Sequence, residues 1–122
     1  MTSMNGATEA PNKFGSELRR AVLSSCVLAL LSTGEHYGFD LVRSLSENYG
    51  MATQEGTVYP LLSRLQKDGA VTSFWQPSDS GPPRKYYRIT DQGADVLAAF
   101  VREWSQFSAN VNGLLNSTGV ST

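Results

Sequence analysis

Residues 56–90 combine an amphipathic helix with two strand-like segments and a turn between them. Apolar residues recur on one face of the helical part, which leaves its polar and basic side chains on the other faces. The apolar positions are Val58, Leu61, Leu62 and Leu65. Gly69 favours the end of that helix, and residues 71–76 and 84–90 are rich in β-branched and aromatic residues. The Gly and Pro residues of 77–83 favour neither helix nor strand. A helix followed by a basic hairpin is typical of a winged helix-turn-helix domain.

The helix before the hairpin contains Pro60, which removes a backbone hydrogen bond when it lies past the first turn. Gly56 weakens the first turn further. The apolar stripe nevertheless continues through the proline. We therefore predict a single helix, straight or kinked, from Gln54 to about Asp68, with Thr53 as its N-cap.

Charge is distributed unevenly along the chain, whose formal net charge is -1. Residues 56–90 contain five Lys and Arg residues and two Asp residues, which gives this stretch +3. The cations are Arg64, Lys67, Arg84, Lys85 and Arg88. A local positive field can attract phosphates even in a slightly acidic protein. The alternative is an ordinary solvated face.

The segments before residue 56 are predicted to form a flexible extension and two helices. Residues 1–15 are mostly small and polar and are expected to be flexible. Ser16 is a plausible N-cap for a helix over 18–31, which is apolar almost all round and must be covered on more than one side. Residues 37–48 form a second amphipathic pattern. We expect the first helix to contact both the core and another subunit.

The last helix, predicted over residues 91–117 with Thr90 as its cap, has the clearest periodicity in the chain. Two interleaved series of apolar residues, each with a spacing of seven, occupy the a and d positions of a heptad. These residues are Leu97, Phe100, Trp104, Phe107, Val111 and Leu114. Nothing in one winged-helix domain is left to cover them, so we predict a homodimer. Residues 118–122 are expected to be a flexible tail.

Several other functions have no support in the sequence. The single cysteine, Cys26, lies in an apolar run and is expected to pack as a small hydrophobe in a reduced, cytoplasmic protein. No segment resembles a signal peptide or a membrane span. His36 is the only histidine, and no catalytic nucleophile, carboxylate pair, metal-ligand cluster or glycine-rich phosphate loop is evident. We expect no enzymatic activity, no metal or cofactor, and no membrane partner.

Three motifs together resemble the PadR family of bacterial transcriptional regulators, over roughly residues 18–115. They are YGFDLVRSL at 37–45, GTVYPLLSRLQKDGAV at 56–71, and GPPRKYYRIT at 81–90 before a long helix. The single helix after the hairpin is similar to the smaller PadR-like branch, in which that helix and the first helix form the dimer.

The resemblance implies a mainly α fold with a small β-hairpin: a winged helix-turn-helix domain over 16–90 and a C-terminal dimerisation helix over 91–117. It also implies that the third helix enters the major groove of a double-stranded DNA operator while the wing touches the minor groove or backbone. On the residues present, the expected DNA contacts are Tyr37, Thr57, Tyr59, Arg64, Lys67, Arg84 and Lys85. Hydroxyl groups suit phosphate oxygens, and Arg or Lys suits a narrow minor groove.

Some of these side chains have a structural alternative. The ring of Tyr37 can pack against the third helix, and Tyr59 can be partly buried beside Pro60. Lys67 can be a solvated charge that complements the helix dipole.

Members of the family commonly release DNA when a small aromatic or planar effector binds near the dimer interface. Trp104 occupies a central a position, so two indoles could sandwich a flat ligand. The expected lining is Trp104, Phe100, Phe107, Val22 and Cys26. In the alternative, Trp104 only fills the dimer core.

The sequence therefore predicts a DNA-binding transcriptional regulator, with repression as the family's usual mode. The alternative is a winged-helix module for protein–protein contacts without sequence-specific DNA binding. A MarR-like regulator would differ mainly in how its C-terminal helix dimerises.

Overall fold

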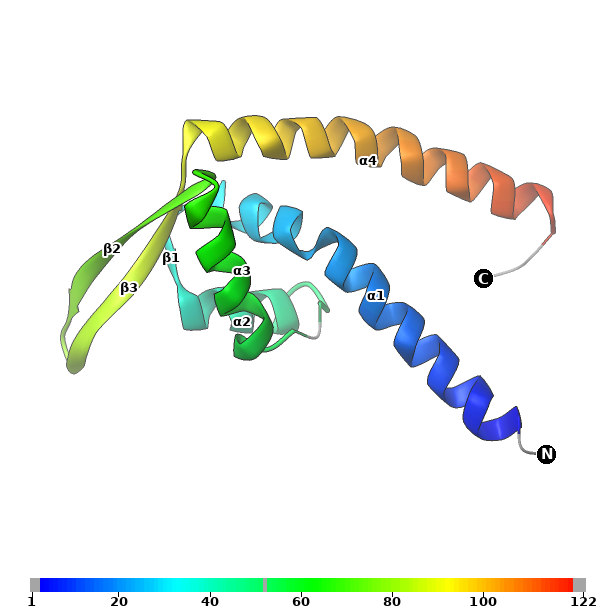
Figure 1. Ribbon diagram of the computed structural model, residues 1–122, viewed down its shortest axis with the longest axis horizontal. Helices are drawn as coiled ribbons and strands as arrows, with labels where there is room; N and C mark the ends of the chain where they lie inside the picture. Colours follow the sequence, from blue (N-terminus) through cyan, green and yellow to red (C-terminus); the bar gives the residue numbers. More distant parts are fainter. Residues whose placement is uncertain (1–2, 52, 120–122) are drawn as a thin grey trace.

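The computed structural model describes the backbone of residues 3–51 and 53–119, with the side chains in these ranges except those of residues 3–13 and 16. The described chain contains four helices and one three-stranded antiparallel sheet of order β1-β3-β2 (Figure 1). The elements are α1 Ser3–Leu31, β1 His36–Tyr37, α2 Gly38–Glu47, α3 Glu55–Lys67, β2 Val71–Ser78, β3 Gly81–Ile89 and α4 Asp91–Ser117. This confirms the predicted mainly α winged helix-turn-helix with a long C-terminal helix.

The start of the first helix differs from the prediction. α1 begins at Ser3, so Ser16 lies inside the helix and the expected N-cap there is wrong. Residues 3–15 of the predicted extension continue α1, while Met1 and Thr2 lie outside the described residues. At the other end of the chain, α4 stops at Ser117 as expected, and residues 120–122 of the predicted tail are also not described.

The hydrophobic core lies where the C-terminal half of α1 meets α2, α3 and the base of the sheet. Its most completely buried side chains are Val27, Leu28, Leu31, Leu41, Val58 and Leu62. Tyr87 closes the core from β3, and Leu97 is the α4 residue that packs against it. The apolar stripe of each short helix therefore faces inward, as its periodicity predicts.

The connection between α2 and α3 is held by Ser46 and not by the expected cap. The Ser46 hydroxyl donates to the carbonyl of Thr53 and accepts from its N–H, at 2.9 and 3.1 Å. α3 begins after Gln54, whose side chain makes no capping hydrogen bond, so the predicted Thr53 cap is wrong. The helix does continue through Pro60 to Lys67, which confirms the prediction of a single helix.

The hairpin is longer than the sequence indicates. β2 and β3 continue through most of residues 77–83, leaving only Asp79 and Ser80 between them. Regular pairing extends from Val71↔Ile89 to Gln76↔Arg84, and the register then shifts before Ser78↔Gly81. The expected seven-residue turn is therefore wrong, because a bulge at this end of the ladder accommodates proline within the strands.

Thr90 forms a tight joint between the end of α3 and the start of α4. Its hydroxyl accepts a hydrogen bond from the Gly93 N–H at 3.0 Å and donates to the Gly69 carbonyl at 2.6 Å. Its own N–H donates to the Ala70 carbonyl at 3.0 Å. Gly93 packs so closely that an added Cβ would meet the carbonyl oxygen of Ala70. The predicted Thr90 cap is thus confirmed.

Beyond this joint, α4 extends away from the sheet with an apolar face exposed (Figure 1). Trp104, Phe107 and Leu114 are 47%, 60% and 65% exposed. Most of the predicted heptad seam is therefore uncovered within one chain.

Candidate nucleic-acid interface

The outer face of α3 carries polar and basic side chains, because its apolar stripe faces the core. Thr57, Ser63, Arg64 and Lys67 are exposed on this helix. Arg64 and Lys67 lie in its last turn, where cations complement the negative end of the helix dipole. At the other end, Gly56 has open space where a Cβ would stand. Among the described residues, no atom beyond the helix itself and the flanking residues lies within 4 Å of that position, so another backbone could approach this turn closely.

Tyr59 is held against α2. Its ring occupies the place where a Cβ on Gly38 would stand, and the residue is 36% exposed. Burial is the main cause that raises the pKa of Tyr59, with smaller contributions from the charges of Glu55, Tyr87 and Tyr37. The hydroxyl therefore stays protonated at neutral pH and can donate a hydrogen bond.

Tyr37 belongs to an aromatic and cationic layer on the outer face of the sheet. Its ring centroid is 5.6 Å from that of Tyr86, and the Arg84 guanidinium lies 4.7 Å from the Tyr37 centroid. Tyr86 in turn stacks with Phe74 at 5.9 Å. The structure thus brings Tyr37 and Arg84 together on the face of the sheet that points away from the core.

Lys85 lies on the opposite face from Arg84, since successive strand residues alternate. Its Nζ is 5.8 Å from the Tyr87 ring, and it pairs across the ladder with Trp75. This is the face on which Ser73 bonds Gln66 of α3. Trp75 is 66% exposed there. Sequence reasoning used Trp75 only as evidence for a strand, although strand alternation could have placed it beside Lys85 and on the side of α3.

Arg88 contributes less positive field than its place in the sequence suggests. Its Nη2 and Nε are 2.6 and 2.8 Å from the Glu35 carboxylate, and its guanidinium lies 4.7 Å from the Phe74 ring centroid. Because Glu35 lies outside residues 56–90, the +3 of that stretch overstates the local field. Within residues 56–90, the exposed cations that remain for a nucleic acid are Arg64, Lys67 and Arg84, with Lys85 partly exposed.

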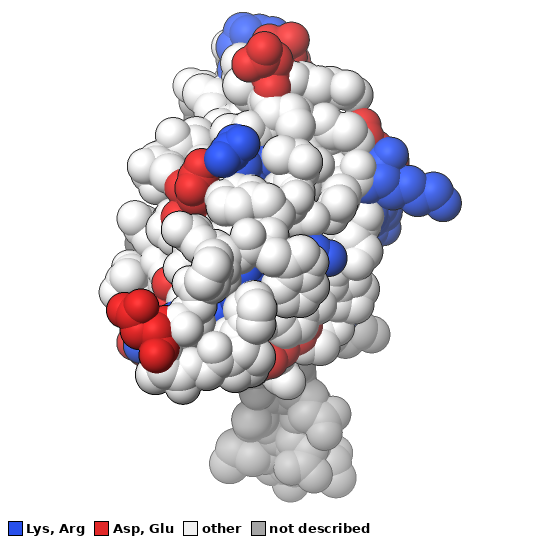
Figure 2. Space-filling view, turned by 90° about the vertical axis from the view of Figure 1, so that its left-hand side faces the viewer, with Lys and Arg blue, Asp and Glu red and all other residues white. Residues whose placement is uncertain are grey.

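Figure 2 shows the hairpin side of the molecule, where basic groups stand apart from one another with carboxylates between them. This arrangement differs from a continuous basic surface. It suits a few positioned contacts better than strong nonspecific attraction.

The predicted effector residues fall into separate places within one chain. The rings of Phe100 and Trp104 stack at 6.0 Å and 12°, and with Phe107 they line a shallow hollow of about 260 Å³. Cys26 instead lines an apolar hollow of about 330 Å³ between α1 and the end of α2. Burial raises the pKa of the Cys26 thiol. Val22 is half-buried on α1.

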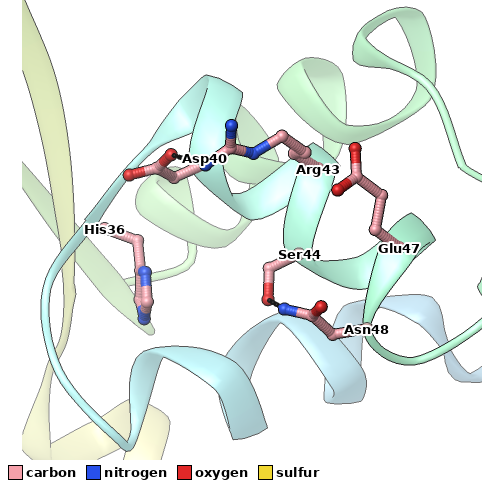
Figure 3. Close-up of a pocket in the computed structure, with 6 residues that line it drawn as sticks. All are labelled: His36, Asp40, Arg43, Ser44, Glu47 and Asn48. Carbon is pink, nitrogen blue, oxygen red and sulfur yellow. Dashed lines mark hydrogen bonds and ion pairs between the residues drawn. The ribbon is translucent and has the colours of Figure 1, made fainter.

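A third hollow, of about 340 Å³, lies between β1 and α2 and is lined by polar groups (Figure 3). Asp40 and Arg43 pair at 3.5 Å, and the Asn48 amide donates to Ser44 at 3.2 Å. The His36 imidazole points away from the Asp40–Arg43 pair, and its buried Nε2 has no hydrogen-bond partner among the described residues. The described residues include no group of three or more His, Cys, Asp or Glu side chains arranged to hold a metal ion.

Comparison with known proteins identifies the family to which this fold and interface correspond. The pattern of the transcriptional regulator PadR-like family matches residues 27–99, more than half of the chain. The chain belongs to the PadR-like family of transcriptional regulators. Members are regulators that bind DNA through the winged helix and are not enzymes. Over the part of the chain that the structure describes, no helix has the length and hydropathy needed to cross a membrane.

Three similar proteins illustrate the relationship. Transcriptional regulator Rv3488 of Mycobacterium tuberculosis is 32% identical over 97 residues, which are 80% of this chain and 89% of that protein. The negative transcriptional regulator PadR of Bacillus subtilis is 30% identical over 78 residues, 62% of this chain and 43% of that protein. The crystal structure of a PadR family regulator from Eggerthella lenta has a TM-score of 0.78 and 35% identity, covering 94% of this chain and 97% of that one.

Proposed function

We propose that this PadR-like regulator is a homodimeric repressor that binds a specific operator and is released by a small planar effector. The observation that carries the DNA-binding part is the exposed polar face of α3, flanked on one side by Lys85 and Trp75 of the hairpin. A helix of this kind fits the major groove, where side chains read base edges. The hairpin then lies over the adjacent backbone or minor groove.

The proposed roles follow from where the side chains lie. Thr57, Arg64 and Lys67 are free to contact DNA from α3. Tyr59 offers a hydroxyl from a ring fixed against Gly38. Lys85 approaches DNA on the α3 side of the sheet, and Arg84 does so from the outer face, over Tyr37. The name of the Bacillus subtilis relative, a negative regulator, supports repression as the mode.

Dimerisation through α4 is supported by the apolar face that one chain leaves exposed. That face includes Trp104, Phe107, Val111 and Leu114. Pairing two copies of this face would remove it from water, which favours association by roughly 25 cal/mol for each Å² of apolar surface. A C2 dimer would also present two copies of α3 to half-sites about 34 Å apart.

The effector proposal rests on the Phe100–Trp104 stack. A hollow lined by three aromatic rings already lies on the face that would meet its symmetry mate. A flat compound inserted between the two copies would change the spacing of the recognition helices, and so shift the population away from the DNA-binding form. Val22 and Cys26 of α1 would join this lining only if the partner's α4 packs across α1.

Gel-shift titration with the DNA upstream of the protein's own gene tests the DNA-binding proposal. We expect the affinity to fall steeply between about 50 and 200 mM salt, as counterions are released from several phosphates. The Arg64→Ala/Lys67→Ala variant and the Lys85→Ala variant should bind more weakly and with a smaller salt slope. Arg102→Ala, which removes an exposed cation from α4, is the control. No specific shift for the wild-type protein on upstream or genomic fragments would favour the protein-contact alternative.

A further inference from the structure

A hollow of about 240 Å³ lies between α1 and the first turn of α3, outside the residues assigned above apart from Thr57. Two arginines of α1, Arg19 and Arg20, line it together with Thr53, Gln54 and Thr57 from the start of α3. The hollow is thus lined on one side by two arginines and on the other by the N-terminus of α3, the positive end of its helix dipole.

The two arginines have no carboxylate partner among the described residues, whose ion pairs are Asp40–Arg43 and Glu35–Arg88. Arg19 is half-buried. Its Nη1 lies 3.2 Å from the place where a Cβ on Gly15 would stand, so the glycine leaves room for this side chain along the helix. Two arginines that line one hollow and have no counterion favour an anionic ligand, and Arg suits oxyanions because its donors form a planar fork.

The start of α3 adds backbone donors, of which the Thr57 N–H already donates to the Gln54 carbonyl at 3.0 Å. Gln54 makes no side-chain cap, so the first N–H groups of the helix lack a side-chain acceptor. The Thr53 Oγ1 is buried and has no hydrogen-bond partner among the described residues. This oxygen is closed to solvent, so a ligand in the hollow would meet the N–H groups of the first turn and not this hydroxyl. An oxyanion at a helix N-terminus also gains from the helix dipole.

Glu55, in the same turn, is the acidic group that could oppose an anion. Glu55 and Tyr59 are four positions apart on α3. Residues i and i+4 share a helical face, whereas residues two positions apart do not. Glu55 therefore faces away from Thr57 and the hollow.

We propose that this hollow binds a phosphate group through Arg19, Arg20 and the N–H groups of the first turn of α3. On the proposed DNA-binding function, on which this part of the inference rests, the occupant is a backbone phosphate that fixes the depth of α3 in the major groove. The same chemistry would accept free inorganic phosphate, and the two sources give different experimental results.

The first experiment titrates inorganic phosphate into the full-length protein and follows the amide signals of Glu55, Gly56 and Thr57 by NMR. We expect saturable shifts in the wild-type protein and at least tenfold weaker binding in Arg19→Ala/Arg20→Ala. Thr53→Val keeps the side-chain shape and loses only a hydroxyl that is closed to the hollow, so it should fold normally and bind phosphate as tightly as wild type. Arg43→Ala/Arg102→Ala removes the same charge elsewhere and should bind normally. The proposal is overturned if wild type shows no saturable shift, or if the Arg19/Arg20 variant binds equally well.

The second experiment measures DNA affinity against salt for the same four proteins. A backbone phosphate as occupant predicts that Arg19→Ala/Arg20→Ala lowers affinity and reduces the salt slope by about one, since each neutralised phosphate contributes about 0.9. Unchanged DNA binding with lost phosphate binding would assign the site to a free anion. A wild-type protein that binds phosphate but no DNA would overturn the proposed function and leave the phosphate site standing.

Discussion

The guanidinium of Arg84 lies over the ring of Tyr37, 4.7 Å from its centroid, and so ties the second strand of the hairpin to the residue that precedes α2. A tyrosine that holds an arginine in this way positions a cation as well as offering a hydroxyl. The two roles can be separated by substitution.

We predict that Tyr37→Phe keeps DNA affinity within about twofold if the ring alone matters, because the Arg84 contact is preserved. Tyr37→Ala should weaken binding about two- to fivefold, the effect expected from losing a cation–π contact of about 0.5–1 kcal/mol. Fluorescence anisotropy with labelled operator DNA measures both. In an Arg84→Ala background, Tyr37→Ala should have little further effect, and an undiminished loss there would show that the tyrosine acts independently of Arg84.

Two glycines of α4 should respond oppositely to alanine. Gly93→Ala places a Cβ against the Ala70 carbonyl and 2.8 Å from Cγ1 of Ile89, so we expect a loss of about 1–3 kcal/mol in the free energy of unfolding. Gly113→Ala has open space around it and should gain about 0.5–1 kcal/mol from helix propensity. Urea unfolding at one fixed protein concentration measures both, since dimerisation adds to apparent stability. Equal effects would show that the joint at Gly93 is less tightly packed than the structure indicates.

The α4 seam predicts that Trp104→Ala dissociates the dimer at concentrations where the wild-type protein stays dimeric. The change removes a side chain that is 47% exposed in one chain and stacked on Phe100. Sedimentation equilibrium gives the dissociation constants. Arg102→Ala lies at the outermost position of the same heptad and should leave the dimer intact. A Trp104→Ala protein that remains as dimeric as wild type would place the interface elsewhere.

Alkaline pH should destabilise the protein through three buried or half-buried acids. Burial raises the pKa of Cys26 above 9.0, and also raises those of Tyr59 and Tyr87 above 10.0. The folded state holds these protons more tightly than the unfolded state, so their contribution is full below pH 9 and is lost as pH rises through the folded-state pKa values. Thermal unfolding from pH 7 to 11 should show this decline. In Cys26→Ala the decline should begin nearer pH 10.

The sequence predicted the elements whose signals are local. The apolar stripe of α3 correctly predicted a helix that continues through Pro60. Thr90 correctly predicted both the N-cap of α4 and the residue at which α4 begins. The seven-residue periodicity from Leu97 to Leu114 lies within α4, as expected. Each of these depends on residues within a few positions of one another.

The features that the sequence did not predict depend on contacts between distant residues. β1 is only His36–Tyr37, and it exists because it pairs with Tyr86 and Tyr87 some fifty positions later. Arg88 was assigned to the basic stretch, but its partner Glu35 lies far before it in the chain. Thr53 was expected to cap α3, whereas the Ser46 hydroxyl already holds its backbone. Such pairings follow from tertiary packing, which neither propensity nor spacing records.

The joint at Thr90 gives α4 the properties of a lever. One hydroxyl is bonded to Gly69, just after the end of α3, and to Gly93 at the start of α4. The arm beyond it has 27 residues, and at 1.5 Å for each residue it is about 40 Å long. A rotation of about 5° about Thr90 would therefore move the C-terminal end of α4 by about 3.5 Å. Conversely, a displacement of that end by a few Å would rotate α3 by only a few degrees.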